Sequence, residues 1–130
     1  KNKSGRILLV EDTEASIFYM QDYLETKGYH VTVARNGYEG VTFAKNLLPD
    51  IILMDVQMPN MDGFEATKSI RAEKLLQDIP IIALTALAMP GDREKCLQAG
   101  MNNYLSKPVN LQELLKLLNE HIALKGAEIE

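Results

Sequence analysis

The sequence predicts an α/β fold in which one parallel sheet carries helices on both of its faces. Short apolar runs alternate with segments of helical periodicity, and this alternation repeats five times in 130 residues. The runs at 51–54 and 79–84 are apolar throughout, which is typical of strands buried on both faces. Polar residues follow the runs, so a site is expected beyond the carboxyl ends of the strands.

The individual elements follow from β-branched apolar runs and from capping residues. Strands are expected at 6–10, 31–34, 51–55, 79–85 and 102–105. Helices are expected from Thr13 to about Lys27, from Asn36 to before Pro49, from Phe64 to about Leu76, from Pro90 to Gly100, and from Asn110 onwards. In the third of these helices Leu75 should face inward and Arg71 outward, and in the fourth Leu97 should face inward.

Composition indicates a single domain with a core spanning about residues 5–124. The chain is 46% hydrophobic, and its net charge of -4 and pI near 5.2 give no basic surface for nucleic acid. Cys96 is the only cysteine, which excludes an intrachain disulfide and a cysteine-based metal site. No apolar run approaches the roughly 20 residues of a membrane span. We therefore expect a cytoplasmic location without membrane contact by this domain.

The informative polar residues all lie where a predicted strand ends. Glu11 and Asp12 follow the first strand, Asp55 ends the third, Thr85 ends the fourth and Lys107 follows the fifth. Taken singly, the carboxylates could cap helices, the threonine could be an ordinary strand-end hydroxyl, and the lysine could be solvated. Their joint occurrence at the ends of four strands favours one site at the edge where those ends meet.

Three carboxylates at close quarters repel one another unless a cation neutralises them. A small number of oxygen ligands favours Mg²⁺. The charges sum to roughly -3 from the acids, +2 from the metal and +1 from Lys107, which leaves room for one dianionic phosphoryl group. Lys107 and the metal would stabilise charge on its oxygens, and Thr85 would donate a hydrogen bond.

Four sequence blocks together carry a family resemblance. They are VED at 10–12, DVQMPNMDG at 55–63, TA at 85–86 and YLSKP at 104–108. With them the chain resembles the receiver domain of the two-component response-regulator family over nearly its whole length, 1–130. The resemblance implies a flavodoxin-like (βα)5 three-layer sandwich with a five-stranded parallel sheet in the order 2-1-3-4-5. The acidic pair is Glu-Asp, where many relatives have Asp-Asp.

The same resemblance implies a phosphoacceptor site. Asp55 would accept a phosphoryl group from the phosphohistidine of a histidine kinase. Mg²⁺ would be held by Asp12, Asp55 and the backbone carbonyl of Gln57, with Glu11 orienting a water on the metal. Hydrolysis of the acyl phosphate needs an in-line water, which residues two places after Asp55 and after Thr85 should control; these are Gln57 and Leu87.

The resemblance also implies contacts to the phosphoryl oxygens from Lys107, Thr85 and the Ala86 amide, and a cis bond between Lys107 and Pro108. The new oxygens should draw the Thr85 hydroxyl toward the site and vacate space behind it. Tyr104, on the neighbouring strand, should then turn inward. The change should reach a partner surface formed by the fourth helix, the fifth strand and the last helix.

The resemblance implies a switch rather than an enzyme, one that promotes its own phosphorylation and dephosphorylation. Its partners would be a histidine kinase or a histidine phosphotransfer protein, and a downstream protein on the switch surface. A second possibility is a receiver of a hybrid sensor kinase, which passes the phosphoryl group on to a histidine phosphotransfer protein. The absence of an initiating Met and the stretch at 83–101 resemble that class.

Three other classes compete with the receiver. A phosphatase of the haloacid dehalogenase kind needs a second Asp as general acid where Gln57 stands. A flavin- or nucleotide-binding module needs a Gly-rich loop after the first strand, where the acidic stretch 11–14 stands instead. A degenerate receiver that works by protein contacts alone would have no need to retain the five residues at the strand ends.

Overall fold

The computed structural model describes residues 5–86 and 89–129, with side chains up to residue 122. Its five parallel strands form one sheet in the order β2-β1-β3-β4-β5, which confirms the predicted flavodoxin-like topology. The strands are β1 (Arg6–Val10), β2 (His30–Ala34), β3 (Ile51–Asp55), β4 (Ile81–Thr85) and β5 (Asn103–Ser106). The order reverses between β1 and β3, so their carboxyl ends flank the crevice where such folds bind ligands.

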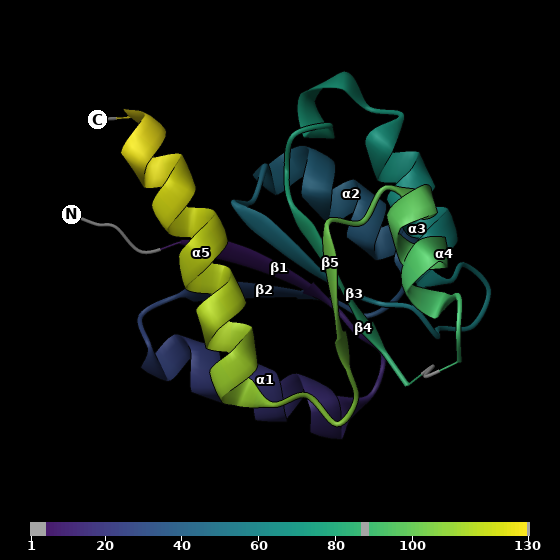
Figure 1. Ribbon diagram of the computed structural model, residues 1–130, viewed down its shortest axis with the longest axis horizontal. Helices are drawn as coiled ribbons and strands as arrows, with labels where there is room; N and C mark the ends of the chain where they lie inside the picture. Colours follow the sequence, from purple (N-terminus) through teal and green to yellow (C-terminus); the bar gives the residue numbers. More distant parts are fainter. Residues whose placement is uncertain (1–4, 87–88, 130) are drawn as a thin grey trace.

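Helices cover both faces of the sheet. They are α1 (Glu14–Thr26), α2 (Gly37–Leu47), α3 (Gly63–Arg71), the 3₁₀ helix η1 (Lys74–Leu76), α4 (Asp92–Ala99) and α5 (Leu111–Ile129). Figure 1 shows α1 and α5 on one face of the sheet and α2, α3 and α4 on the other. Among the described residues, none of these helices is long and apolar enough to cross a membrane.

Two apolar layers hold the sandwich together, one on each face of the sheet. Met20 of α1 and Leu114 of α5 pack against one face, while Ala44 of α2 and Ile70 of α3 pack against the other. Every residue of β3 and β4 is buried, as the continuous apolar runs predict. The edge strand β2 alternates between exposed and partly buried positions up to Ala34, because along most of its length only one of its faces packs against an apolar layer.

Capping residues fix the starts of three helices. The side chain of Asn36 accepts from the Glu39 amide at 2.9 Å, and that of Asn110 accepts from the Glu113 amide at 3.0 Å. Asp62 and the residue three places on form a reciprocal capping box at the start of α3. At α2 the box is incomplete, because the Glu39 carboxylate accepts from the backbone N–H of Arg35 instead.

The prediction of one continuous helix over 64–76 is wrong. The α-helix ends at Arg71 and the chain continues into η1, whose tighter winding changes which residues face the core. Leu75 is therefore 80% exposed and Leu76 is buried. The guanidinium of Arg71, expected to point outward, instead folds back onto carbonyl groups of the following segment.

The fourth helix starts later than expected, at Asp92 rather than Pro90. Gly91 has φ +94 and precedes it, and the Asp92 carboxylate accepts from the Met89 amide at 2.6 Å. Leu97, expected to face inward, is 46% exposed, because the buried side of α4 runs through Asp92, Cys96 and Ala99. The strands β1 and β3 have the expected bounds, and the bounds of β2, β4 and β5 differ from the expected ones by one or two residues.

Candidate functional site

The register of the sheet brings the predicted polar residues to one edge. Val10 of β1 pairs with Met54 of β3, so the next residues, Glu11 and Asp55, emerge side by side. Asp55 in turn pairs with Leu84 of β4, one residue before Thr85. Four residues that lie far apart along the chain, Lys107 included, therefore meet at the carboxyl ends of the strands.

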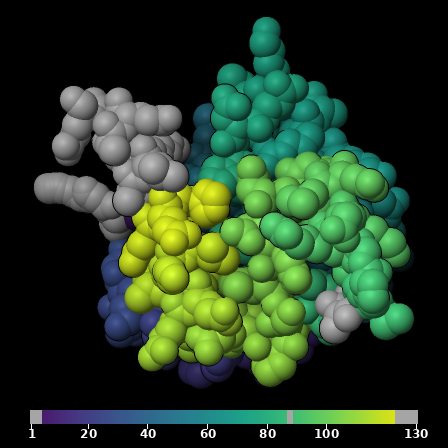
Figure 2. Space-filling view, in the orientation of Figure 1, coloured from purple at the N-terminus to yellow at the C-terminus, as the bar shows by residue number. Residues whose placement is uncertain are grey.

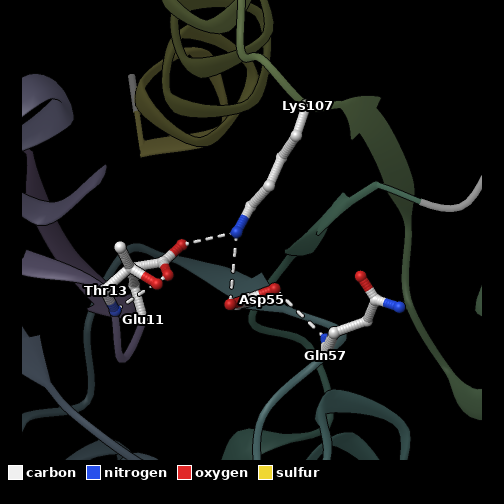
Figure 3. A network of polar contacts seen from close by, with 5 residues as sticks. All are labelled: Glu11, Thr13, Asp55, Gln57 and Lys107. Carbon is white, nitrogen blue, oxygen red and sulfur yellow. Dashed lines mark hydrogen bonds and ion pairs between the residues drawn. The ribbon is translucent and has the colours of Figure 1, made fainter. Parts of the chain in front are cut away.

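An ion-pair cluster occupies this edge. Lys107 extends from the β5–α5 loop, and its Nζ lies 3.0 Å from Glu11 Oε1 and 3.2 Å from Asp55 Oδ2 (Figure 3). Glu11 is 0% exposed and Asp55 is 2% exposed. Two buried carboxylates thus share one ammonium group, an arrangement that leaves their negative charge incompletely neutralised.

Backbone N–H groups hold the two buried carboxylates in place. The Gln57 amide donates to Asp55 Oδ1 at 3.1 Å, and the Thr13 amide donates to Glu11 Oε2 at 3.1 Å. The Lys107 amide donates to the Thr85 carbonyl at 2.7 Å, which places the lysine immediately beyond the end of β4. Sequence reasoning missed the Thr13 contact, because a backbone donor has no residue-type signal.

The electrostatics of the cluster change its protonation. Burial, and next the charge of Glu11, raise the pKa of Asp55 from 3.8 to about 6, against a smaller opposing effect of the Lys107 charge. Burial disfavours the charged form of Lys107, but the hydrogen bond to Glu11 and the charge of Asp55 outweigh it and raise the pKa of Lys107. The surplus negative charge of the site contributes to both shifts.

The acidic residues fit a hard divalent cation. Glu11, Asp12 and Asp55 each offer a carboxylate oxygen, and these atoms lie within 4.8 Å of one another. Asp12 is exposed at the mouth of the site, whereas the other two are buried. Oxygen ligands in small number, with open positions left for water and substrate, match the coordination that Mg²⁺ prefers.

A close approach of α3 to β3 shapes the floor of the site. A Cβ atom on Gly63 would lie 2.4 Å from the Asp55 carbonyl oxygen and 2.8 Å from the Val56 Cα. Gly63 also donates its N–H to the Val56 carbonyl at 3.0 Å. Only glycine therefore allows α3 to start directly beneath the strand end that carries Asp55.

The other predicted residues are placed as follows. Thr85 is buried at the end of β4, and Tyr104 of β5 is partly buried against the α3 and α4 side of the core. The side chain of Gln57 is exposed. The Lys107-Pro108 bond is cis, as expected. The predicted gating residue Leu87 lies outside the described residues.

A buried carboxylate, further acids and a lysine at the reversal point of a parallel sheet are the features of the phosphoacceptor class of α/β switch domains. The response regulator receiver domain family matches residues 7–119. The chain belongs to this family, and so is a receiver domain, the phosphoacceptor module of two-component signalling. Receiver domains act as switches between histidine kinases and downstream targets.

Curated relatives and solved structures agree with this assignment. The chain is 37% identical to the polar-differentiation response regulator DivK of Brucella anthropi, over 89% of this chain and 94% of that relative. The receiver domain of sensor histidine kinase PA1611 from Pseudomonas aeruginosa is 45% identical, with TM-score 0.86 over 93% of this chain and 99% of that one. That structure has a magnesium ion coordinated in its active-site cleft. Vibrio cholerae chemotaxis protein CheY4 is 31% identical, with TM-score 0.85 over 91% of this chain and 98% of that one.

Proposed function

We propose that Asp55 accepts a phosphoryl group from the phosphohistidine of a histidine kinase. The observation that carries this proposal is the bridging of Glu11 and Asp55 by the Lys107 ammonium at 3.0 and 3.2 Å. An unprotonated Asp55 carboxylate oxygen attacks phosphorus, the P–N bond to the donor imidazole breaks, and its electron pair leaves with the imidazole. The products are an aspartyl phosphate and an unphosphorylated histidine.

Each neighbouring side chain has a distinct task in this transfer. Lys107 contacts the developing charge on the phosphoryl oxygens, because its Nζ already lies beside the accepting carboxylate. Thr85 donates its hydroxyl to another of these oxygens from the end of β4. The Gln57 amide fixes the carboxylate plane by donating to Asp55 Oδ1, which orients the attacking oxygen.

Mg²⁺ would be held by Asp12, Asp55 and the Gln57 carbonyl, with Glu11 orienting a water on the metal. When bound, the metal neutralises the surplus acidic charge and draws electron density from the phosphoryl oxygens. The acidic cluster of the site and the magnesium ion in the PA1611 receiver support this assignment. With a pKa of about 6, the Asp55 carboxylate is mostly unprotonated, and hence nucleophilic, at neutral pH, and a bound cation would favour that form further.

As a whole, residues of about 5–124 form one switch domain in the cytoplasm, where phosphohistidine is made from ATP. The domain promotes its own phosphorylation and dephosphorylation and is not otherwise an enzyme. Its downstream protein partner binds the face made by α4, β5 and α5, which lie side by side on one surface in Figure 2. Neither nucleic acid nor membrane is a partner of this domain.

A second candidate is a receiver within a hybrid sensor kinase, which passes the phosphoryl group to a histidine phosphotransfer protein. It is favoured by the 45% identity to the receiver domain of sensor histidine kinase PA1611. The chemistry at Asp55 is the same in both candidates. They differ in the direction of onward transfer, which phosphotransfer to a purified phosphotransfer protein would reveal.

The proposal predicts Mg²⁺-dependent phosphorylation at Asp55. Incubation with acetyl phosphate and Mg²⁺ should add one phosphoryl mass to the intact protein, and EDTA should abolish the adduct because the carboxylates then repel the donor. Asp62→Asn removes one negative charge, as Asp55→Asn does, but at the N-cap of α3 rather than in the site. It serves as the control and should still form the adduct. An adduct on Asp55→Asn, or equal yield in EDTA, contradicts the proposal.

A further inference from the structure

We propose that Tyr19 is a positioning residue for phosphoryl transfer, holding the segment that carries Lys107 over Asp55. This inference rests on the proposed function, in which Lys107 contacts the phosphoryl group. Tyr19 lies on α1, and its hydroxyl donates to the Val109 carbonyl at 3.0 Å, 90 residues along the chain. That bond joins the helix following the acidic pair to the loop carrying the lysine.

The Lys107 side chain needs such a restraint. Its flexible four-carbon stem must keep one ammonium within contact distance of two buried carboxylates. The loop is fixed on one side of Lys107, where its amide donates to the Thr85 carbonyl at 2.7 Å. On the other side, Val109 is buried and its carbonyl is held by Tyr19. The backbone around Lys107 is therefore hydrogen-bonded to β4 on one side and to α1 on the other.

The surroundings of Tyr19 support a role at the site rather than in the core. Tyr19 is 48% exposed and is not among the residues that pack in the apolar layer between α1 and the sheet. It lines a groove with Ala15 and Ser16 of α1 and with Lys107 and Pro108 of the loop. Figure 1 shows the start of α1 beside this β5–α5 loop. Loss of the hydroxyl alone would free the loop and leave the ring in place.

The test compares Tyr19→Phe with Tyr29→Phe. Tyr29 is the matched control, because its hydroxyl also reaches across to another element, Asn119 of α5, at 2.7 Å, without contacting a residue of the site. With acetyl phosphate as donor, no protein partner touches α1. We expect Tyr19→Phe to slow phosphorylation about three- to tenfold through misplacement of the lysine, and Tyr29→Phe to match wild type.

Two further measurements separate positioning from a general structural effect. In a Lys107→Ala background, Tyr19→Phe should not slow phosphorylation further, since the residue it positions is gone. In the metal-free, unphosphorylated protein, NMR signals of the Lys107 side chain should shift and sharpen in Tyr19→Phe but not in Tyr29→Phe.

The outcomes are distinguishable. Wild type that fails to form the adduct overturns the proposed function, and the NMR comparison then still decides whether Tyr19 restrains Lys107. If wild type reacts but Tyr19→Phe reacts equally fast, the positioning role is wrong. Equal slowing by Tyr19→Phe with and without Lys107, or unchanged Lys107 signals, also overturns it.

Discussion

At the scale of single residues, the site contains buried charged groups that do not favour stability. Glu11 and Asp55 are both buried and share the Lys107 ammonium. Burying an ion pair costs desolvation free energy that its attraction often fails to offset, and a second carboxylate adds repulsion. The arrangement is thus unfavourable for stability but well suited to binding a cation and a phosphoryl group.

The raised pKa of Asp55 predicts a pH-dependent cost to stability in the absence of metal. With the pKa near 6 in the folded chain and 3.8 as its ordinary value, the folded state binds the proton more tightly. The stabilisation of the folded state by the proton on Asp55 is fully present below about pH 4 and is lost as the pH rises through about 6. Asp55→Asn does not titrate, so its advantage over wild type should grow across that window and then level off.

Urea unfolding in EDTA at about pH 4.5 and about pH 7.5 measures this effect. The free energy of unfolding of Asp55→Asn should exceed that of wild type by more at the higher pH than at the lower pH. Asp22→Asn, at an exposed position on α1, controls for the loss of one negative charge and should show no such gain. A difference between Asp55→Asn and wild type that shrinks as the pH rises would contradict the assigned sign.

At the scale of elements, the α3–η1 segment is organised by Arg71. Its guanidinium donates to the carbonyls of Gly100, Leu76, Gln77 and Ile79, and to the side chain of Asn102. The Asn102 side chain also accepts from the Ile81 amide, at the start of β4. One side chain thereby satisfies carbonyls at the end of η1 and just after it, and connects them to the C-terminal end of α4.

Arg71→Lys should therefore be destabilising although the charge is kept. A lysine ammonium has three donors and no planar fork, so several of these carbonyls would be left unsatisfied. We expect the free energy of unfolding to fall by about 2 kcal/mol, measured by urea denaturation. Arg93→Lys, at an exposed position on α4, should be neutral. Equal stability of the two variants would show that the Arg71 bonds contribute nothing.

At the scale of the whole molecule, a signal must pass from the strand ends to the α4–β5–α5 face. The register pairs Ala83 with Tyr104 and Thr85 with Ser106. Side chains alternate along a strand, so Thr85 and Tyr104 project from the same face of the sheet on neighbouring strands. A movement of the Thr85 hydroxyl toward Asp55 opens space on the face where Tyr104 packs.

We predict that phosphorylation draws Thr85 inward and that Tyr104 follows. The coupling need be only about 1–3 kcal/mol, the usual scale of allosteric free energies. NMR spectra with and without beryllofluoride, a phosphoryl mimic, should show shifts at Tyr104 and along α4, and Thr85→Ala should lose them. A serine at this position keeps the hydroxyl, so Thr85→Ser is the control and should retain the shifts. The full pattern in Thr85→Ala would mean that the signal takes another route.

The sequence by itself determined the fold class and which polar residues meet at the strand ends. Strand and helix periodicities are local, and a polar residue after a buried strand marks the edge where parallel strands end. Glu11, Asp55 and Lys107 could therefore be assigned to one mouth, which the structure confirms. The helix starts at Asn36 and Asn110 were equally predictable, because capping is decided within a few residues.

Only the tertiary structure decided which side chains are buried and which distant segments contact one another. The α-helix ends at Arg71, so Leu75 lies in η1 and is exposed, while the Arg71 guanidinium folds back onto carbonyls of the following segment and of Gly100. The tertiary structure also buried Glu11 completely and joined Tyr19 to Val109. Such contacts link residues far apart in the chain and leave no local pattern, so packing and the satisfaction of backbone hydrogen bonds fix them only once the sheet has formed.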